Sequence, residues 1–245
     1  MASNIAGSDL FLDVREGNGI FSTVVGGNGP GVPNQGTGMI DAGSLLDRQK
    51  WQSALNNDSL WQGTSQRELE IRFSSVAGVR SYQLFDASTN APPAAPLAPR
   101  AIGPVQNFTS GQAIPVVNST TTPATDFGAQ VVINGSPADG DTFIVKPSAN
   151  KSMFQTVQEM LDLLRSPVDS GTARTAFSVQ MQAHLNNLDQ ALANVGRVQA
   201  TVGARLQVLD GLSSSSSALD VQYQQTLSGL QDLDYAQAIS DFTRQ

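Results

Sequence analysis

The residue patterns that could do chemistry in this 245-residue sequence are few and incomplete. Asp126, Phe127 and Gly128 form the Asp-Phe-Gly tripeptide that binds magnesium in protein kinases, but the kinase His-Arg-Asp loop and glycine-rich loop are missing from the sequence. Glu68 and Glu70 alternate in "RELEIR" and would share one strand face, as a carboxylate pair of a carbohydrate-active enzyme could. Nothing else in the sequence predicts a sugar cleft, and a solvated strand face explains both carboxylates.

Three further patterns are candidates for binding. "GGNGPG" (residues 26–31) is rich in glycine but fits neither the dinucleotide nor the P-loop phosphate motif. Asp139 and Asp141 flank a glycine in a predicted turn, where turn chemistry explains both and calcium binding is the alternative. His184 is the sole histidine, and its acidic neighbour Asp189 is five residues away and off its helix face. We therefore predict no catalytic residue, no cofactor and no metal site.

The composition excludes several partner classes. The net charge is −7 and no basic patch is visible, so we expect neither nucleic acid nor an anionic membrane surface as a partner. There is no cysteine, which excludes disulfides, thiolate metal sites and cysteine nucleophiles. The sequence also contains no apolar run long enough to cross a membrane.

The elements that must position these residues change type along the chain. All 12 prolines lie between Pro30 and Pro167, and 17 of the 22 glycines precede Gly171. This composition step predicts a domain boundary near residues 166–171. The expected fold class is α+β, with a β-rich domain over 1–168 that contains one short helix, followed by a long rod-like helix in 171–245.

Alternating apolar residues predict the strands of the first part. "RELEIRF" (Arg67–Phe73) places Leu69, Ile71 and Phe73 on one side, which is typical of a half-buried antiparallel strand. Further candidate strands are "DLFLDVRE", "RSYQLFD", "AIPVV", "AQVVING" and "DTFIVKP". The turn residues of "NGSPADGD" predict a hairpin between the last two strands.

"KSMFQTVQEMLDLLRS" predicts the one short helix, which Pro167 would end. Its apolar residues recur at helical spacing, so we expect them to form a buried stripe: Met153, Val157, Met160, Leu161 and Leu164.

A heptad seam dominates the second part. Apolar residues alternate at spacings of four and three over about four heptads, interrupted by Gln199. A helix over 172–210 would be ~58 Å long, which predicts a rod. We expect this seam to supply the helix-packing residues: Met181, Leu185, Leu188, Leu192, Val195, Val202, Leu206 and Leu209, extended by Tyr223, Leu227, Leu230, Tyr235 and Ile239.

The segment "GLSSSSSALD" (residues 211–220) allows two interpretations. Glycine and serine are weak helix formers, so a turn and a helical hairpin are possible. The heptad phase nevertheless continues, because Tyr223 lies two whole heptads after Leu209. This continuity favours one long helix that is weakened in the middle.

The tail resembles a known family. "VGARLQVLD" (Val202–Asp210) and "QYQQTLSGLQDLDYAQAIS" (Gln222–Ser240) resemble the C-terminal helical region of the flagellin family. "QDLDYAQAIS" is similar to the Asp-x-Asp-Tyr-Ala pattern that flagellins carry. "GSDLFLDVREGNGIF" (Gly7–Phe21) resembles the variable domain of the family's hook-associated members at the hook–filament junction.

The resemblance implies a structural, non-enzymatic subunit of the bacterial flagellum that joins hook to filament by helical packing. It implies export by the flagellar type III route and an extracellular location. The implied partners are other copies of the chain, a neighbouring hook-associated protein and flagellin, with an export chaperone as a further candidate. Residues 171–245 would be the wall helix and 1–168 the outer domain. The family's N-terminal helical region has no counterpart in this sequence, so we expect a fragment.

Two other functions are kept as alternatives. A fibre or adhesin-type binding module would grip a ligand with its β domain and oligomerise through its helix, and ligand binding by residues 1–168 alone would favour it. A carbohydrate-active enzyme would depend on Glu68 and Glu70.

Overall fold

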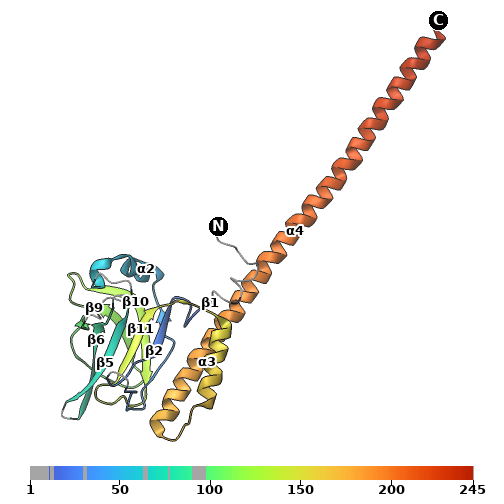
Figure 1. Cartoon of the computed structure of the whole chain (residues 1–245). Coiled ribbons are helices and arrows are strands. Elements are labelled where there is room, and N and C mark those ends of the chain that lie inside the picture. Colours follow the sequence, from blue (N-terminus) through green and yellow to red (C-terminus); the bar gives the residue numbers. More distant parts are fainter. Residues whose placement is uncertain are drawn as a thin grey trace. The chain divides into compact units, whose positions relative to one another are not determined.

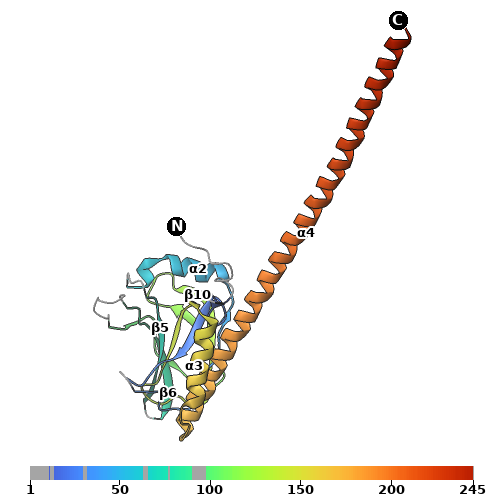
Figure 2. The same ribbon diagram turned by 45° about the vertical axis from the view of Figure 1, so that its right-hand side comes forward.

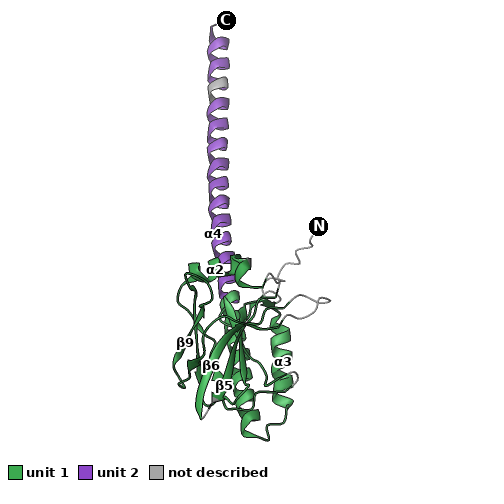
Figure 3. Cartoon of the chain, turned by 90° about the vertical axis from the view of Figure 1, so that its left-hand side faces the viewer, with its two compact units in different colours: residues 1–194 green, residues 195–245 purple. Residues whose placement is uncertain are grey.

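The computed structural model of the chain describes residues 11, 14–29, 32–62, 66–76, 78–89 and 98–244. It combines antiparallel sheets with a long C-terminal helix, which confirms the α+β fold class (Figure 1). The chain divides into two compact units, residues 1–194 and 195–245 (Figure 3). The sequence predicted a boundary near 166–171, which is where the last helix begins; the division between the units falls within that helix.

The described strands form three sheets, and every pairing among them is antiparallel. The largest sheet has the order β2 (Phe21–Val25), β11 (Thr142–Pro147), β5 (Leu69–Val76), β6 (Val79–Asp86) and β7 (Arg100–Ala101), with β8 (Gln106–Asn107) also on β6. The second joins β3 (Met39–Ile40), β10 (Thr125–Asn134) and β4 (Ser44–Leu45), with β9 (Ala113–Asn118) also on β10. The third pairs β1 (Val14–Arg15) with β12 (Asn150–Lys151).

Most of the predicted strands are present. β5 buries Leu69, Ile71 and Phe73 on one face, as the alternation predicts. "RSYQLFD", "AIPVV", "AQVVING" and "DTFIVKP" correspond to β6, β9, β10 and β11. Of "DLFLDVRE", only Val14 and Arg15 lie in a described strand, and positions 9, 10, 12 and 13 lie outside the described residues.

The predicted hairpin between β10 and β11 is wrong. β11 pairs with β2 and β5, whereas β10 pairs with β3, β4 and β9, so the two strands belong to different sheets. The segment 134–141 does contain a bend and a turn, but side-chain hydrogen bonds hold it against residues 35–37. Turn chemistry therefore predicted the bend correctly and the strand pairing incorrectly.

A second short helix was not predicted from the sequence. α2 (Arg48–Asn56) begins after Asp47, whose side chain accepts hydrogen bonds from the backbone N–H groups of Gln49 and Lys50. It buries Trp51 and Ala54 and lies next to β10 at one end of the strands (Figures 1 and 2). Among its described residues, the β-rich part therefore has two named α-helices, α2 and α3, and a 3₁₀ turn, η1 (Asp58–Leu60), where the sequence predicted one short helix.

α3 (Met153–Arg165) is the predicted helix, but most of its predicted buried stripe is exposed. Val157, Leu161 and Leu164 face outward, and Leu164 is 57% exposed. The inward face instead contains Thr156, which is buried, and the half-buried Met153 and Met160. α3 therefore begins where the sequence predicted, but a different side of the helix packs inward.

α4 (Gly171–Thr243) is a single helix of 73 residues. It continues through Ser213–Ser217, so the hairpin alternative is excluded and the long helix is confirmed. The first turns of α4 lie beside α3 within the first unit (Figures 1 and 2).

One hydrophobic core fills the first unit. Its aromatic residues form two groups: Phe21, Trp51, Trp61 and Phe127 in one, and Phe73, Tyr82, Phe108 and Phe143 in the other. Trp61 is fully buried, and its Nε1 donates a hydrogen bond to the carbonyl oxygen of Ala54 at 2.7 Å.

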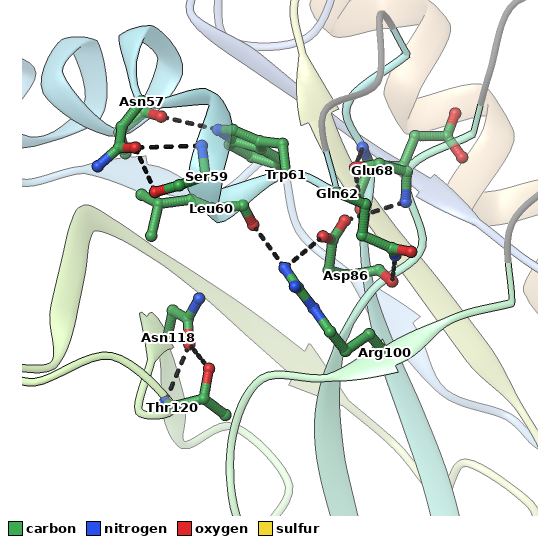
Figure 4. Close-up of polar contacts among 12 residues, drawn as sticks. Asn57, Ser59, Leu60, Trp61, Gln62, Glu68, Asp86, Arg100, Asn118 and Thr120 are labelled. Atoms are coloured by element: carbon green, nitrogen blue, oxygen red, sulfur yellow. Dashed lines mark hydrogen bonds and ion pairs between the residues drawn. The ribbon is translucent and has the colours of Figure 1, made fainter.

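An ionic contact joins a buried carboxylate to a partly exposed arginine in the first unit. Asp86 is fully buried, and Arg100 Nη2 lies 3.1 Å from its Oδ2 and 3.1 Å from the carbonyl oxygen of Leu60 (Figure 4). Arg100, which lies in β7, therefore links Leu60 at the end of η1 to Asp86 at the end of β6.

Candidate assembly surface

The Asp-Phe-Gly tripeptide lies where the register of the β10–β9 pairing shifts, and all three of its residues make contacts that stabilise the fold. Asp126 Oδ2 lies 2.8 Å from Lys50 Nζ on α2, and Oδ1 accepts a hydrogen bond from the Gly128 N–H. The hydrogen bond from Lys50 lowers the pKa of the Asp126 carboxyl. Phe127 is buried, and its ring meets Trp61 edge-on at 5.4 Å between centroids.

Glycine is required at 128 for two reasons. Its φ is +65°, a conformation that costs other residues energy, and an added Cβ would lie 2.5 Å from the carbonyl oxygen of Asp47. That oxygen belongs to the cap of α2, so Gly128 lets β10 pass closely beneath the helix.

The carboxylates of Glu68 and Glu70 do not converge with other acids on a described site. Glu70 Oε1 lies 2.8 Å from Arg72 Nε, and the Arg72 guanidinium stacks over the Phe85 ring at 4.6 Å. The backbone of Glu68 bonds to Ser88 and Ala87. Glu70 is thus part of a strand-surface ion pair.

Hydrogen bonds from Asn28 join the glycine-rich loop to the turn that contains Asp139 and Asp141. Asp141 is fully buried and accepts four hydrogen bonds: from the N–H groups of Gln35, Gly36 and Ala138, and from the side-chain amide of Asn28. Asp139 accepts one from the Ser75 N–H. Among the described residues, no three His, Asp or Glu side chains gather where a metal ion could bind.

His184 joins α4 to the β-rich part. Its Nδ1 lies 3.9 Å from Glu159 Oε2 on α3, and the same carboxylate oxygen accepts a hydrogen bond from Lys151. Burial lowers the pKa of His184 below its ordinary value of 6.5, against the attraction of Glu159. His184 therefore has a packing role between α3 and α4.

Within the first unit, α4 packs through a face that the seam did not predict. Val179 and Ala191 are buried, Ala183 and Asn187 are half-buried, and Asn187 Oδ1 accepts a hydrogen bond from the Gly17 N–H at 2.7 Å. Of the predicted seam residues here, Met181 and Leu188 are half-buried, and Leu185 and Leu192 are exposed. Small and polar side chains of α4 therefore pack against the rest of the first unit, whereas Leu185 and Leu192 are exposed to solvent.

In the second unit, the predicted seam is an exposed apolar surface. Val195 is half-buried, and the following seam residues are exposed: Val202, Leu206, Leu209, Tyr223, Leu227 and Leu230. Val198, Leu212 and Leu219 were not predicted but fall on the same side of the helix. Counting Val195 as heptad position a, these residues occupy a, d and e, an apolar stripe about 100° wide. We call these ten residues, Val195 to Leu230, the α4 stripe.

Tyr235 and Ile239 lie on another face of α4. At about 100° per residue they are roughly 140° and 180° around the helix from Leu230. Both are highly exposed, and Phe242 beside them is 83% exposed. The predicted extension of the seam beyond Leu230 therefore forms a separate apolar patch.

A further exposed apolar stripe follows α3. It consists of Phe154, Val157, Leu161 and Leu164, and the ring of Phe11 lies 6.2 Å from that of Phe154. No helix within the described part of the chain combines the length and apolarity needed to cross a membrane.

No protein-family model and no curated protein matches the chain. Solved structures do. The chain is similar to flagellar hook-associated protein 3 from Legionella pneumophila, with 25% identity, a TM-score of 0.68, and coverage of 93% of this chain and 60% of that chain. It is likewise similar to the flagellar junction protein FlgL from the same bacterium, with 25% identity, a TM-score of 0.60, and coverage of 83% and 57%.

A third solved structure shares the fold. FlgL from Xanthomonas campestris is 24% identical with a TM-score of 0.61, and the match covers 85% of this chain and 55% of that chain. The chain thus spans less than two thirds of the length of these proteins. The resemblance predicted from the sequence is confirmed: most of this chain is similar to hook-associated protein 3 structures.

Proposed function

We propose that the chain is a structural subunit of the bacterial flagellum that helps to join the hook to the filament. The observation that carries the proposal is the similarity over 93% of the chain to a flagellar hook-associated protein 3. The contacts of the candidate chemical residues agree with it, because Asp126, Glu70 and Asp141 are engaged in ion pairs or in hydrogen bonds that hold loops and strands together.

The α4 stripe is the proposed assembly surface. It presents ten apolar residues on one side of a helix, and all ten are exposed or half-buried leucine, valine or tyrosine side chains within the second unit. Burying one such side chain fully stabilises a contact by about 1.5–3 kcal/mol. The proposed partners are other copies of the chain, a neighbouring hook-associated protein and flagellin, outside the cell after flagellar export.

Binding to purified flagellar partners tests the function. The chain is mixed with hook-associated protein and flagellin from the same bacterium, and complexes are measured by sedimentation. We expect binding by the chain, and loss of binding when Leu206 and Leu209 are both changed to aspartate. Gln207→Asp is the matched control, because Gln207 lies on the opposite, polar face and should tolerate the charge. Binding that survives the leucine substitutions would refute the stripe as the assembly surface.

A further inference from the structure

A groove lies on the β-rich part of the first unit, on the side of the largest sheet that points away from the core. β5 and β11, which are neighbours in this sheet (Figure 1), form its floor, and the described part of the glycine-rich loop forms a wall. Its volume is about 850 Å³, within the range of about 300–1,000 Å³ that small-molecule sites occupy. We call it the β5–β11 groove.

The floor of the groove combines charged, polar and apolar side chains. Residues 69, 71 and 73 of β5 are buried in the core, so Glu70 and Arg72 point to the opposite face of the sheet. Across the strands, Glu70 is the neighbour of Ile144 and Arg72 is the neighbour of Thr142. The floor thus places a carboxylate and a guanidinium beside an isoleucine side chain.

The Glu70–Arg72 ion pair keeps hydrogen-bonding capacity for a ligand. The pair joins Arg72 Nε to Glu70 Oε1 at 2.8 Å. Among the described residues, none donates a hydrogen bond to Glu70 Oε2, and none accepts one from the two Nη atoms of Arg72. The guanidinium is stacked on the Phe85 ring, which holds it in place. The floor therefore presents donors and an acceptor side by side in a fixed arrangement.

The wall of the groove has its backbone donors engaged. The N–H groups of Gly26 and Gly27 donate to the carbonyl oxygen and to Oγ1 of Thr142. The N–H of Asn28 donates to the carbonyl oxygen of Val32. A phosphate cradle depends on free N–H groups in successive residues, and residues 26–28 do not offer them. The Val32 side chain, which is exposed, adds apolar surface to the wall.

Charge and strand pairing narrow the class of ligand. Glu70 balances the charge of Arg72, so the floor favours neither an anion nor a cation. β5 and β11 are each paired on both sides, so the floor has no free strand edge to which an extended peptide could add. Glu70 is the one carboxylate among the described residues that line the groove, whereas most glycoside hydrolases use two. These features fit an uncharged ligand rich in hydroxyl groups that is bound without being cleaved.

We propose that the β5–β11 groove binds a neutral oligosaccharide. Sugar hydroxyl groups can donate to the Glu70 carboxylate and accept from the Arg72 guanidinium. The C–H faces of the sugar rings can lie against the apolar side chains of Ile144 and Val32. The groove is several times larger than one sugar ring, so it accommodates a short chain of linked rings. This binding would be a function of the β-rich part in addition to the proposed assembly role of α4.

Calorimetric titration of the full 245-residue chain tests the class of ligand. The probes are cellotetraose, maltotetraose, xylotetraose and chitotetraose, with tetragalacturonate as the anionic sugar and an uncharged tetrapeptide as the peptide. We expect at least one neutral tetrasaccharide to bind with a Kd of about 1 mM or lower and to remain intact. The inference is overturned if none of the four binds at about 10 mM, if the anionic sugar or the peptide alone binds, or if the sugar is cleaved.

Substitutions in the floor test the location of the site. Glu70→Gln and Arg72→Gln, made separately, should each weaken binding of the neutral tetrasaccharide by about tenfold or more, because each removes a charged hydrogen-bonding group. Glu68→Gln is the matched control, because Glu68 precedes β5 on the same strand face and does not line the groove. Affinity that is unchanged in both floor variants, or reduced equally in the control, would place the sugar elsewhere and overturn the inference.

A substitution in the wall provides a test that leaves the ion pair intact. Val32→Asp should weaken binding by about fivefold or more, because it removes apolar contact with the sugar. Val79→Asp is the control, since Val79 is also exposed but lies at the turn of the β5–β6 hairpin and does not line the groove. Equal affinities of the two variants would contradict the proposed wall.

The outcomes separate this inference from the proposed function. The substituted residues lie outside the α4 stripe, so each variant should still bind the flagellar partners. Absence of sugar binding overturns the inference and leaves the flagellar role standing. Fluorescence of Trp51 and Trp61, both in the core of the first unit, verifies that each variant is folded.

Discussion

Replacing Asp141 by asparagine should destabilise the first unit strongly. The two carboxylate oxygens accept four hydrogen bonds: Oδ1 from the Gln35 N–H at 2.7 Å and the Asn28 amide, and Oδ2 from the N–H groups of Gly36 at 2.9 Å and Ala138 at 2.7 Å. Asparagine keeps one oxygen and replaces the other by an NH₂ group, which cannot accept. Two N–H donors then lose their acceptor in a site where the side chain is fully buried.

The expected loss follows from those two bonds. A hydrogen bond to a charged group contributes about 1.5–3 kcal/mol, so we expect Asp141→Asn to lower the free energy of unfolding by about 3–6 kcal/mol. In a domain of this size, about 1 kcal/mol shifts the melting temperature by roughly 2–4 °C, so the shift should be about 6–24 °C.

Urea unfolding followed by tryptophan fluorescence measures this loss. Trp51 and Trp61 are both buried in the core of the first unit, so their emission reports on the unit that Asp141 stabilises. Asp139→Asn is the matched control in the same turn, because Asp139 accepts a single side-chain hydrogen bond, from the Ser75 N–H, at an exposed site. A loss below about 1 kcal/mol for Asp141→Asn, or equal losses for both variants, would refute the reasoning.

Three further predictions use the same unfolding assay. Gly128→Ala should cost at least about 2 kcal/mol, through its positive φ and its close approach to the α2 cap, whereas Gly78→Ala, with positive φ but open space, should cost about 1 kcal/mol. Arg100→Met should cost about 1–3 kcal/mol, because it leaves buried Asp86 without its cation while Arg100 itself is partly solvated. Burial lowers the pKa of His184 from 6.5, so the unfolded chain binds the imidazole proton more readily than the folded chain. The free energy of unfolding should therefore be highest above pH 6.5 and should decrease as the pH falls below it. His184→Gln should reduce this pH dependence of the free energy of unfolding.

Many strands of the β-rich part could be predicted because apolar and polar residues alternate along them. β5 buries Leu69, Ile71 and Phe73 as predicted, since a period of two allows one side of a strand to face the core. The pairing partner of each strand could not be predicted from this alternation. Turn residues between β10 and β11 specify a chain reversal, but Asp141 attaches that turn to residues 35 and 36, and the strands enter different sheets.

The sequence signal for α2 was present and weak. Asp47 is a good N-cap, and Trp51 and Ala54 have the spacing of one helix face, but the remaining residues of the helix are mostly polar and the segment is only nine residues long. Tertiary packing of α2 against β10 supplies the stability that the local sequence does not. The face of α3 was misjudged for a related reason, because apolar spacing identifies a stripe without identifying what covers it.

The exposed apolar positions of α4 were predicted in part, and their role in assembly stays a prediction. The 4,3 spacing located the seam at a and e positions, and the structure adds Val198, Leu212 and Leu219 at d positions. With these residues the serine segment is no longer a gap in the apolar surface. Tyr235 and Ile239 belong to a different face, because the phase of the apolar residues changes after Leu230.

The two faces of α4 within the first unit support the proposal that the exposed leucines form an interface. Val179, Ala183 and Ala191 pack on the chain's own β-rich part, and their small size lets the helix lie close to it. Leu185 and Leu192 extend further but face outward, Leu192 with 70% exposure. A helix that used leucine only for its own core would place these two inward. Their outward placement, continued by the α4 stripe beyond residue 195, supports the proposal that the large apolar side chains of this helix bind partners outside this chain.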